Sequence, residues 1–179
     1  MKSTYLFTTF IIIGMLSLGC EYTKKHDYLL RTVKGDFNEI GAENGYVNSS
    51  GEMVIDYGKY YHCVTDTFRN FAIVYTKSGK IVGIDRGEHE LYEVFVYDNG
   101  PDPLSDGLFR IVKDGKIGYA DRNGSIVIEP IYQCAFPFKE GIAKVSKDCN
   151  QLQDGEHYQW ESKQWIFINK KGKEITTAN

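Results

Sequence analysis

The chain has 179 residues, of which 42% are hydrophobic and 14% aromatic, and its formal net charge is -3. This composition is that of a globular body with a core and excludes a disordered chain. Lys and Arg residues are interspersed with acidic ones along the chain. Because no basic stripe of the kind that follows a phosphate backbone is present, we expect no nucleic-acid partner.

The first 19 residues form a segment of their own. Lys2 is followed by an apolar run from Tyr5 to Leu18, which ends at Gly19 and Cys20. A helix that spans a bilayer needs about 20 apolar residues, and this run is shorter. The segment 1–19 is therefore predicted to be a hydrophobic signal helix. Since no Ala-x-Ala motif precedes the end of the run, we expect cleavage between Gly19 and Cys20.

The stretch Leu16-Ser17-Leu18-Gly19-Cys20 resembles the lipobox of bacterial lipoproteins, in the looser form of the Bacteroidetes type. The resemblance implies that Cys20 becomes the new N-terminus and carries a lipid on its sulfur, and two or three acyl chains attach a protein stably to a membrane. An ordinary cleaved signal or an uncleaved anchor is the alternative. We expect a bacterial envelope location, with the outer membrane favoured and the face open, and residues 20–27 as a polar tether.

The rest of the chain repeats itself. Similar stretches begin near Leu29, Phe71, Leu108 and Ile142. Each leads to a second similar stretch with one Asn or Asp in a shared column, namely Asn48, Asp85, Asp121 and Asn169. The period is about 36 residues, and the last unit carries an insertion of about a dozen residues before Gln164. We predict one domain over 28–179, with units near 28–70, 71–106, 107–140 and 141–179.

The pattern inside a unit is that of strands and tight turns. Phe109 and Ile111 alternate with Arg110, and the stretches 113–116 and 121–124 carry Asp and Gly in the arrangement of hairpin turns. No segment shows a sustained period of 3.6 residues. The prediction is an all-β fold of tandem antiparallel β-meander or hairpin repeats in an elongated array.

The third unit resembles the WG repeat, also called the KWG repeat. The residues that carry the resemblance are Gly115-Lys116-Ile117-Gly118-Tyr119-Ala120-Asp121, then Gly124, Pro130, Tyr132, Phe138 and Gly141. The name-giving Trp-Gly pair is replaced by Ile117-Gly118 here and by Trp165-Ile166 in the last unit. The resemblance implies a β-rich array of the kind found in bacterial envelope and secreted proteins, with no shared catalytic residues.

Asp121 and Asn123 have oxygen-bearing side chains like those of a calcium loop, but the spacing is wrong. The helix-flanked calcium loop needs a Glu at its twelfth position, where this chain has Pro130, and an oxygen ligand at its first, where it has Tyr119. We predict instead an Asx-turn, in which a side-chain oxygen accepts backbone N–H groups and a later Gly takes a positive φ. The predicted turn residues are Asn48, Gly51, Asp85, Asp121, Gly124, Asn169 and Gly172.

Three cysteines follow Cys20, and an oxidising envelope allows them at most one bridge. A bridge requires two Cα atoms within about 7 Å, and Cys134 with Cys149 is the more reachable pair. A buried free thiol is the alternative for each. The four His residues show no zinc-site spacing, and the chain contains no nucleophile or phosphate-loop motif, so we predict no metal, cofactor or catalytic residue.

The insertion in the last unit is the best candidate for recognition, because it departs from the repeat. We name His157, Tyr158 and Trp160 in it, and Trp165 directly after it, as candidate recognition residues. Aromatic side chains, also including Tyr57, Tyr60 and Tyr61, offer large contact area for a peptide or a sugar, while burial in the core is the alternative. The sequence thus favours a non-enzymatic lipoprotein that contacts a protein or a glycan. The alternative hypothesis is a carbohydrate-binding accessory protein or an envelope hydrolase.

Overall fold

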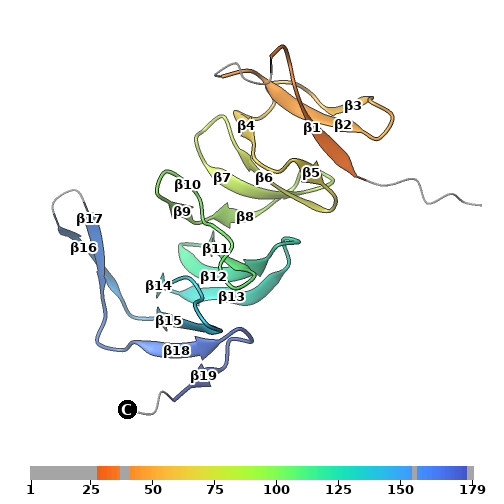
Figure 1. The fold of residues 1–179 in the computed structure, drawn as a ribbon. Coiled ribbons are helices and arrows are strands. Elements are labelled where there is room, and N and C mark those ends of the chain that lie inside the picture. Colours follow the sequence, from red (N-terminus) through yellow and green to blue (C-terminus); the bar gives the residue numbers. More distant parts are fainter. Residues whose placement is uncertain (1–27, 37–40, 155–156, 177–179) are drawn as a thin grey trace, which may run out of the picture.

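The computed structural model of the protein describes residues 28–36, 41–154 and 157–176. Within these residues every regular element is an antiparallel strand, which confirms the predicted all-β class (Figure 1). No helix long and apolar enough to cross a membrane occurs among them. The predicted signal helix, Gly19, Cys20 and the tether lie outside the described residues.

Three of the sheets hold most of the strands. The first has the order β3-β2-β1-β5, the second β13-β12-β11-β8-β7-β6-β4, and the third β14-β15-β18-β19. Two hairpins, β9-β10 and β16-β17, form separate two-stranded sheets. The strands are β1 Leu29–Val33, β2 Asn44–Asn48, β3 Met53–Ile55, β4 His62–Cys63, β5 Thr67–Phe68, β6 Phe71–Tyr75, β7 Ile81–Asp85, β8 Glu90–Val94, β9 Val96–Tyr97, β10 Gly100–Pro101, β11 Leu108–Lys113, β12 Lys116–Asp121, β13 Ile126–Tyr132, β14 Cys134–Ala135, β15 Ile142–Ser146, β16 Asn150–Asp154, β17 His157–Glu161, β18 Ile166–Asn169 and β19 Glu174–Ile175.

Four three-stranded meanders use one register. They are β1-β2-β3, β6-β7-β8, β11-β12-β13 and β15-β18-β19. In each, the first residue of the first strand pairs with the last residue of the second strand. These pairs are Leu29 with Asn48, Phe71 with Asp85, Leu108 with Asp121, and Ile142 with Asn169. The register places the Asn or Asp column of the sequence at the same turn of every meander.

The first three meanders also share a bulge between their second and third strands. Tyr46 pairs with Ile55 while Val47 pairs with Met53, so one residue of β3 has no pairing partner on β2. The corresponding shifts occur between β7 and β8 and between β12 and β13. Because a bulge bends a strand and increases its twist, it turns the third strand across the second. The β18-β19 pair has no such shift.

Gly118 lies where this bend brings two backbones together. A Cβ atom at this position would stand 2.5 Å from the carbonyl oxygen of Ile128 and 2.6 Å from the backbone nitrogen of Pro130. Gly45 faces the backbone of Ile55 and Asp56 in the same way in the first meander. The glycine of the repeat pattern is therefore required by close backbone approach, which a side chain cannot relieve by rotating.

We expect Gly118→Ala to lower the free energy of unfolding by about 2 kcal/mol, the cost of inserting a methyl group into filled space. Gly79→Ala is the control, because a Cβ there meets nothing within 4 Å and the cost is only that of its φ of +86°. Urea unfolding of both variants measures the difference. An equal or smaller loss for Gly118→Ala would show that the close approach is not a constraint.

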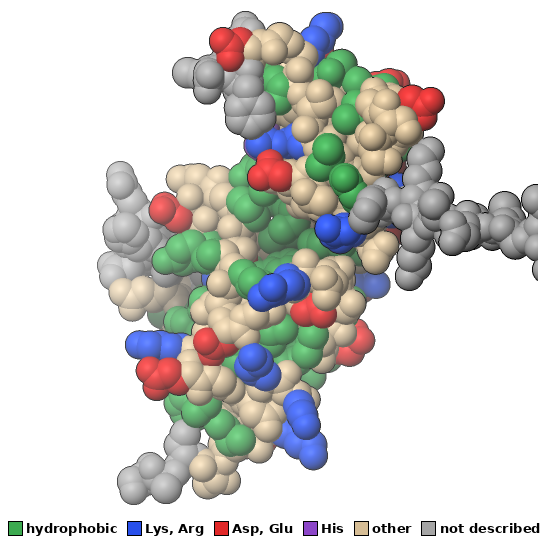
Figure 2. Space-filling view, turned by 45° about the vertical axis from the view of Figure 1, so that its right-hand side comes forward, with side chains coloured by type: hydrophobic (Ala, Val, Ile, Leu, Met, Phe, Trp, Pro, Cys, Tyr) green, Lys and Arg blue, Asp and Glu red, His purple; other side chains and the backbone are tan. Residues whose placement is uncertain are grey.

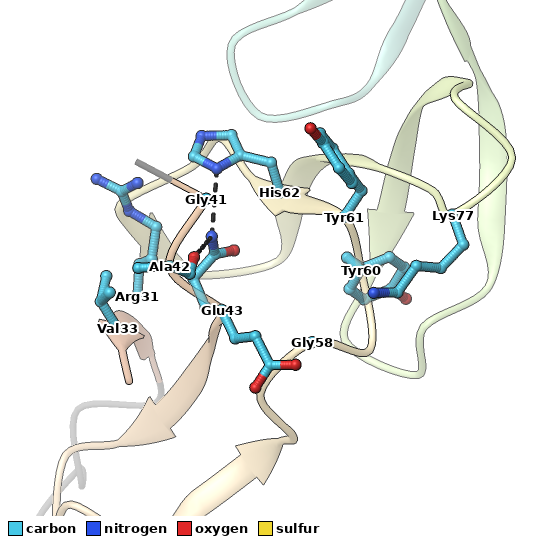
Figure 3. A pocket seen from close by; sticks show the side chains of 11 residues that line it. Arg31, Val33, Gly41, Ala42, Glu43, Gly58, Tyr60, Tyr61, His62 and Lys77 are labelled. Atoms are coloured by element: carbon cyan, nitrogen blue, oxygen red, sulfur yellow. Dashed lines mark hydrogen bonds between the residues drawn. The ribbon is translucent and has the colours of Figure 1, made fainter. Parts of the chain in front are cut away.

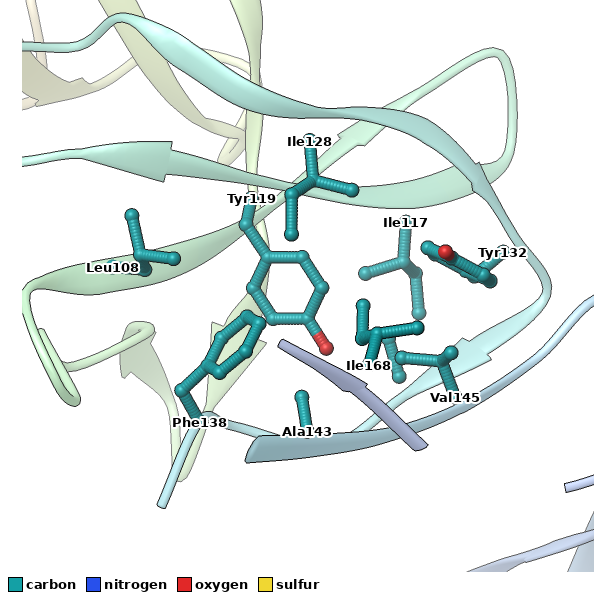
Figure 4. Packing of buried hydrophobic residues seen from close by; sticks show 10 residues of the cluster. Leu108, Ile117, Tyr119, Ile128, Tyr132, Phe138, Ala143, Val145 and Ile168 are labelled. Carbon is teal, nitrogen blue, oxygen red and sulfur yellow. The ribbon is translucent and has the colours of Figure 1, made fainter. Parts of the chain in front are cut away.

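The core is divided into three clusters that follow the chain. One joins the first and second meanders, from Leu29 to Ile84, and the next joins the second and third, from Ile81 to Ala120. The third joins the last two meanders and consists of Leu108, Ile117, Tyr119, Ile128, Tyr132, Ala135, Phe138, Ala143, Val145 and Ile168 (Figure 4). Each meander thus buries its apolar face against its neighbours in the sequence.

A buried Tyr–Phe pair recurs in the first and third clusters. The ring of Tyr119 meets the edge of Phe138 at 4.7 Å between centroids, and its hydroxyl donates to the carbonyl oxygen of Phe136 (Figure 4). Tyr46 packs on Phe68 at 5.3 Å, and its hydroxyl donates to the carbonyl oxygen of Thr65. Burial raises the pKa of both Tyr46 and Tyr119 far above the ordinary value, so both hydroxyls remain donors.

One ion pair is buried in the body. Arg110, the polar residue in the alternating pattern of β11, is 4% exposed, and Asp102 is 5% exposed. The Asp102 carboxylate accepts bonds from the backbone N–H, Nε and Nη2 of Arg110, and Arg110 Nη1 donates to the carbonyl oxygen of Ala135. The pair connects the segment directly after β10 and the strand β14 to β11.

Candidate functional site

The insertion of the last unit is a β-hairpin, β16-β17, which projects from the side of the molecule (Figure 1). A disulfide between Cys134 on β14 and Cys149, directly before β16, anchors its base to the body, with the two Cα atoms 6.0 Å apart. Cys134 is in reach because β14 pairs it with Ser146, three residues before Cys149. Cys63 is a free, fully buried cysteine in the part of the chain that the structure describes.

Hydroxyl groups tie the two ends of the insertion together. The hydroxyls of Ser146 and Ser162 lie 2.8 Å apart, and both also bond to the carbonyl oxygen of Asp148. Ser146 is fully buried, whereas Ser162 is partly exposed. The hairpin is therefore held at a fixed place on the body, as a recognition element must be.

Four aromatic side chains meet beside this base, and we call Phe95, Phe136, Trp160 and Trp165 the aromatic surface. Trp160 contacts Phe95 at 5.9 Å and Phe136 at 5.4 Å between ring centroids, both edge to face. Phe136 in turn contacts Trp165 at 5.5 Å. Phe136 is 41% exposed, whereas Trp160 is partly buried against the core. The aromatic surface is thus rigid on its inner side and open to solvent at Phe136.

Two cations lie at the ends of this row of rings. The Arg110 guanidinium is 4.0 Å from the centroid of Phe95. At the other end the Lys144 ammonium is 4.5 Å from Trp165 and 5.8 Å from Phe136. Arg110 is buried and serves the fold, while Lys144 is partly exposed and adds positive charge at the solvent edge of the aromatic surface.

The structure brings two of the four candidate recognition residues together. Trp160 and Trp165 do not touch directly but meet through Phe136. His157 and Tyr158 lie on β17, and their side chains are outside what the structure describes. The sequence alone did not single out Phe95, Phe136 or Lys144. Only their position in space identifies them, because they lie close to the insertion in the fold but outside it in the sequence.

The remaining aromatic candidates gather elsewhere. Tyr60 and Tyr61 line a polar pocket of about 500 Å³ beside the first meander (Figure 3). The pocket is formed by β1, by the β2 start with the residues before it, by β4 with the loop before it, and by the β6-β7 turn, which contributes Lys77. Tyr61 is 72% exposed, whereas Tyr60 packs against the core. Tyr57 does not line this pocket, and its hydroxyl lies 3.2 Å from that of Thr32, so the structure does not gather the predicted aromatic residues in one place.

A buried amide organises this pocket. Asn44 is 3% exposed, and its Oδ1 accepts the backbone N–H of Cys63 at 2.6 Å. Its Nδ2 donates to the carbonyl oxygen of Ala42 and lies 3.2 Å from Nδ1 of His62 (Figure 3). Burial, followed by the charge of Arg31, lowers the pKa of His62, and burial raises the pKa of the Cys63 thiol to about 11. Both groups are therefore neutral near pH 7.

The Asn and Asp column forms one turn four times. Oδ1 of Asp121 accepts the backbone N–H groups of Asn123 and Ser125, and the other three positions make the same pair of bonds. Gly51, Gly124 and Gly172 have φ of 82°, 83° and 73°. Glu88 takes this position in the second meander with φ of 63°. A carboxylate that holds two backbone N–H groups serves a turn, and no cluster of three metal-ligating side chains occurs among the described residues.

Charge is evenly distributed on the face shown in Figure 2, where acidic and basic side chains alternate and hydrophobic ones lie between them.

No curated protein and no solved structure is similar enough to this chain to count as a match. The family model of the WG containing repeat does match, over residues 117–148. This segment runs from β12 to the end of β15 and includes Gly118, the Asp121 turn and the Tyr119–Phe138 pair. Over these residues the chain is similar to the WG containing repeat family.

Proposed function

We propose that the protein is a lipid-anchored bacterial envelope protein without enzymatic activity, built as a tandem array of four WG-like units. The shared register of the four meanders and the three clusters that join neighbouring units support the array. In an array of this kind each unit contacts only its neighbours, and an insertion in one unit is free to serve recognition.

The aromatic surface is the observation that carries the proposed function. It combines the exposed ring of Phe136 with three half-buried rings, a lysine at its edge and a hairpin anchored beside it by a disulfide. Rigid aromatic side chains provide contact area at low cost in conformational entropy. The surface therefore serves to bind a protein or a glycan of the envelope.

A carbohydrate-binding accessory protein is the second candidate function. The half-buried Trp165 ring, with Lys144 above it and Phe136 beside it, favours this candidate. An aromatic face attracts the apolar face of a sugar ring, and an ammonium group donates hydrogen bonds to its hydroxyls. Binding to glycan arrays distinguishes it from a protein-binding module.

The membrane anchor is tested by changing Cys20 to Ser in the full chain. We expect the wild-type protein to fractionate with membranes and to have an intact mass that begins at Cys20 and includes the lipid. Cys20→Ser is expected to lose the lipid mass and at least tenfold of the membrane-bound fraction. Cys63→Ser, the same change at a cysteine outside the lipobox-like stretch, is the matched control. A wild-type protein that is soluble and carries no added mass would refute the anchor without touching the aromatic surface.

A further inference from the structure

The pocket beside the first meander has a hydrogen-bonding pattern that can be deduced from Asn44. Because Oδ1 of Asn44 accepts the backbone N–H of Cys63, its Nδ2 must be the group that faces His62. An amide nitrogen has only hydrogens to offer, so Nδ1 of His62 accepts and the imidazole proton resides on Nε2. His62 thus presents a neutral N–H donor at the wall of the pocket.

Among the charged side chains around the pocket, one ammonium group is available to bind a ligand. Arg31 is paired with Asp66 at 2.8 Å, and Glu43 is paired with Lys34 at 3.3 Å. Lys77 has no ion-pair partner among the residues that the structure describes. Figure 3 shows it reaching toward the pocket from the β6-β7 turn, on the side opposite Arg31 and His62. The pocket therefore has the capacity to neutralise a single negative charge.

On the side of the pocket that carries Tyr60, the side chain of Glu88 holds this tyrosine in place. Glu88 adopts a positive φ where the other three turns have glycine, and its carboxylate accepts bonds from Tyr60 at 3.1 Å and Lys59 at 2.8 Å. A non-glycine residue at such a φ has an energetic cost, and here its side chain fixes a wall of the pocket. Tyr61 adds an exposed ring. Glu43 adds a carboxylate that accepts hydrogen bonds from hydroxyl groups and repels a doubly charged anion.

We propose that this pocket binds a small ligand with one carboxylate and several hydroxyls, of the hexuronic acid class, whose carboxylate pairs with Lys77 and whose hydroxyls accept a hydrogen bond from His62 on the opposite side. A volume of about 500 Å³ accommodates a six-membered sugar acid. The ring hydroxyls meet Glu43 and the tyrosine wall. The site depends neither on the lipid anchor nor on the aromatic surface.

Calorimetric titration of the purified full chain with D-glucuronate tests the proposal. We expect saturable binding that is at least tenfold tighter than that of D-glucose and of the uncharged methyl ester of glucuronate. Lys77→Ala and His62→Phe are each expected to weaken it at least tenfold. Lys80→Ala removes a lysine near the same turn that pairs with Glu93 outside the pocket, and it should bind as the wild type does.

A second titration separates the class of ligand, and thermal melting shows whether each variant is folded. Tighter binding of inorganic phosphate than of glucuronate would overturn the carboxylate assignment. Equal binding of glucuronate and glucose, or wild-type affinity in a folded Lys77→Ala variant, would overturn the site. Trp165→Ala should leave glucuronate binding unchanged, so failure here and failure of the proposed aromatic site are distinguishable.

Discussion

Replacement of Asp102 by Ala is expected to lower the free energy of unfolding by about 3 to 5 kcal/mol, the loss typical when one partner of a buried ion pair is removed. The carboxylate accepts three bonds from Arg110, and both residues are almost completely buried. Without it, a guanidinium group stays enclosed beside Phe95 with no countercharge. Urea denaturation followed by fluorescence measures the effect.

Two variants show whether the loss of unfolding free energy comes from the unpaired charge of Arg110. Glu43→Gln breaks the exposed Lys34–Glu43 pair and is expected to cost less than about 1 kcal/mol. The double variant Asp102→Leu with Arg110→Met removes both charges and should recover most of the stability lost in Asp102→Ala. If the double variant is as unstable as the single one, the hydrogen bonds themselves and not the uncompensated charge hold the loop.

Loss of the disulfide is the second large effect. The Cys134–Cys149 bridge closes a loop with a sequence separation of 15 residues, for which the chain-entropy relation gives about 3 kcal/mol. We therefore expect Cys134→Ser with Cys149→Ser to lower the unfolding free energy by about that amount. The hairpin should also become the first site of proteolysis, because only the serine hydroxyl bonds and the packing of Trp160 then remain, among the contacts described above, to hold it on the body.

Cys63→Ser is the matched control for the disulfide, since Cys63 is the free cysteine of the described chain. It removes a thiol without opening a loop, so the hairpin should stay as resistant to protease as in the wild type. Reduction of the wild-type protein should reproduce the double variant. Unchanged stability and protease resistance after reduction would mean that the bridge does not hold the hairpin.

Local features of the fold could be predicted from the sequence because they depend on nearby residues. An Asp or Asn followed by Gly makes an Asx-turn whatever surrounds it, so the column from Asn48 to Asn169 marks the end of the second strand in each meander. The turn at Asp114 and Gly115 likewise has the positive φ values, 51° and 70°, that its sequence indicates. The bulge opposite Gly118 could not be predicted, because it arises from pairing between two strands.

The candidate site was only partly predictable for the same reason. Trp160 was selected because the insertion interrupts the repeat, yet its contacts Phe95 and Phe136 come from other units. Arg110 looked like the polar member of an alternating strand, and only the fold shows that Asp102 accompanies it into the interior. The pocket at Asn44 had no motif at all, since its lining residues come from four separate segments.

The central claim, that the aromatic surface is the recognition site, is tested most directly by capture of envelope components on the purified protein. The double variant Phe136→Ala with Trp165→Ala removes the exposed ring of Phe136 and the half-buried ring of Trp165 and spares Trp160, which packs on the core. Tyr61→Ala removes an exposed ring from the other site and serves as the control. Our account predicts that one glycan or protein is retained equally by the wild type and Tyr61→Ala and at least tenfold less by the folded double variant. Equal retention by all three proteins would contradict it.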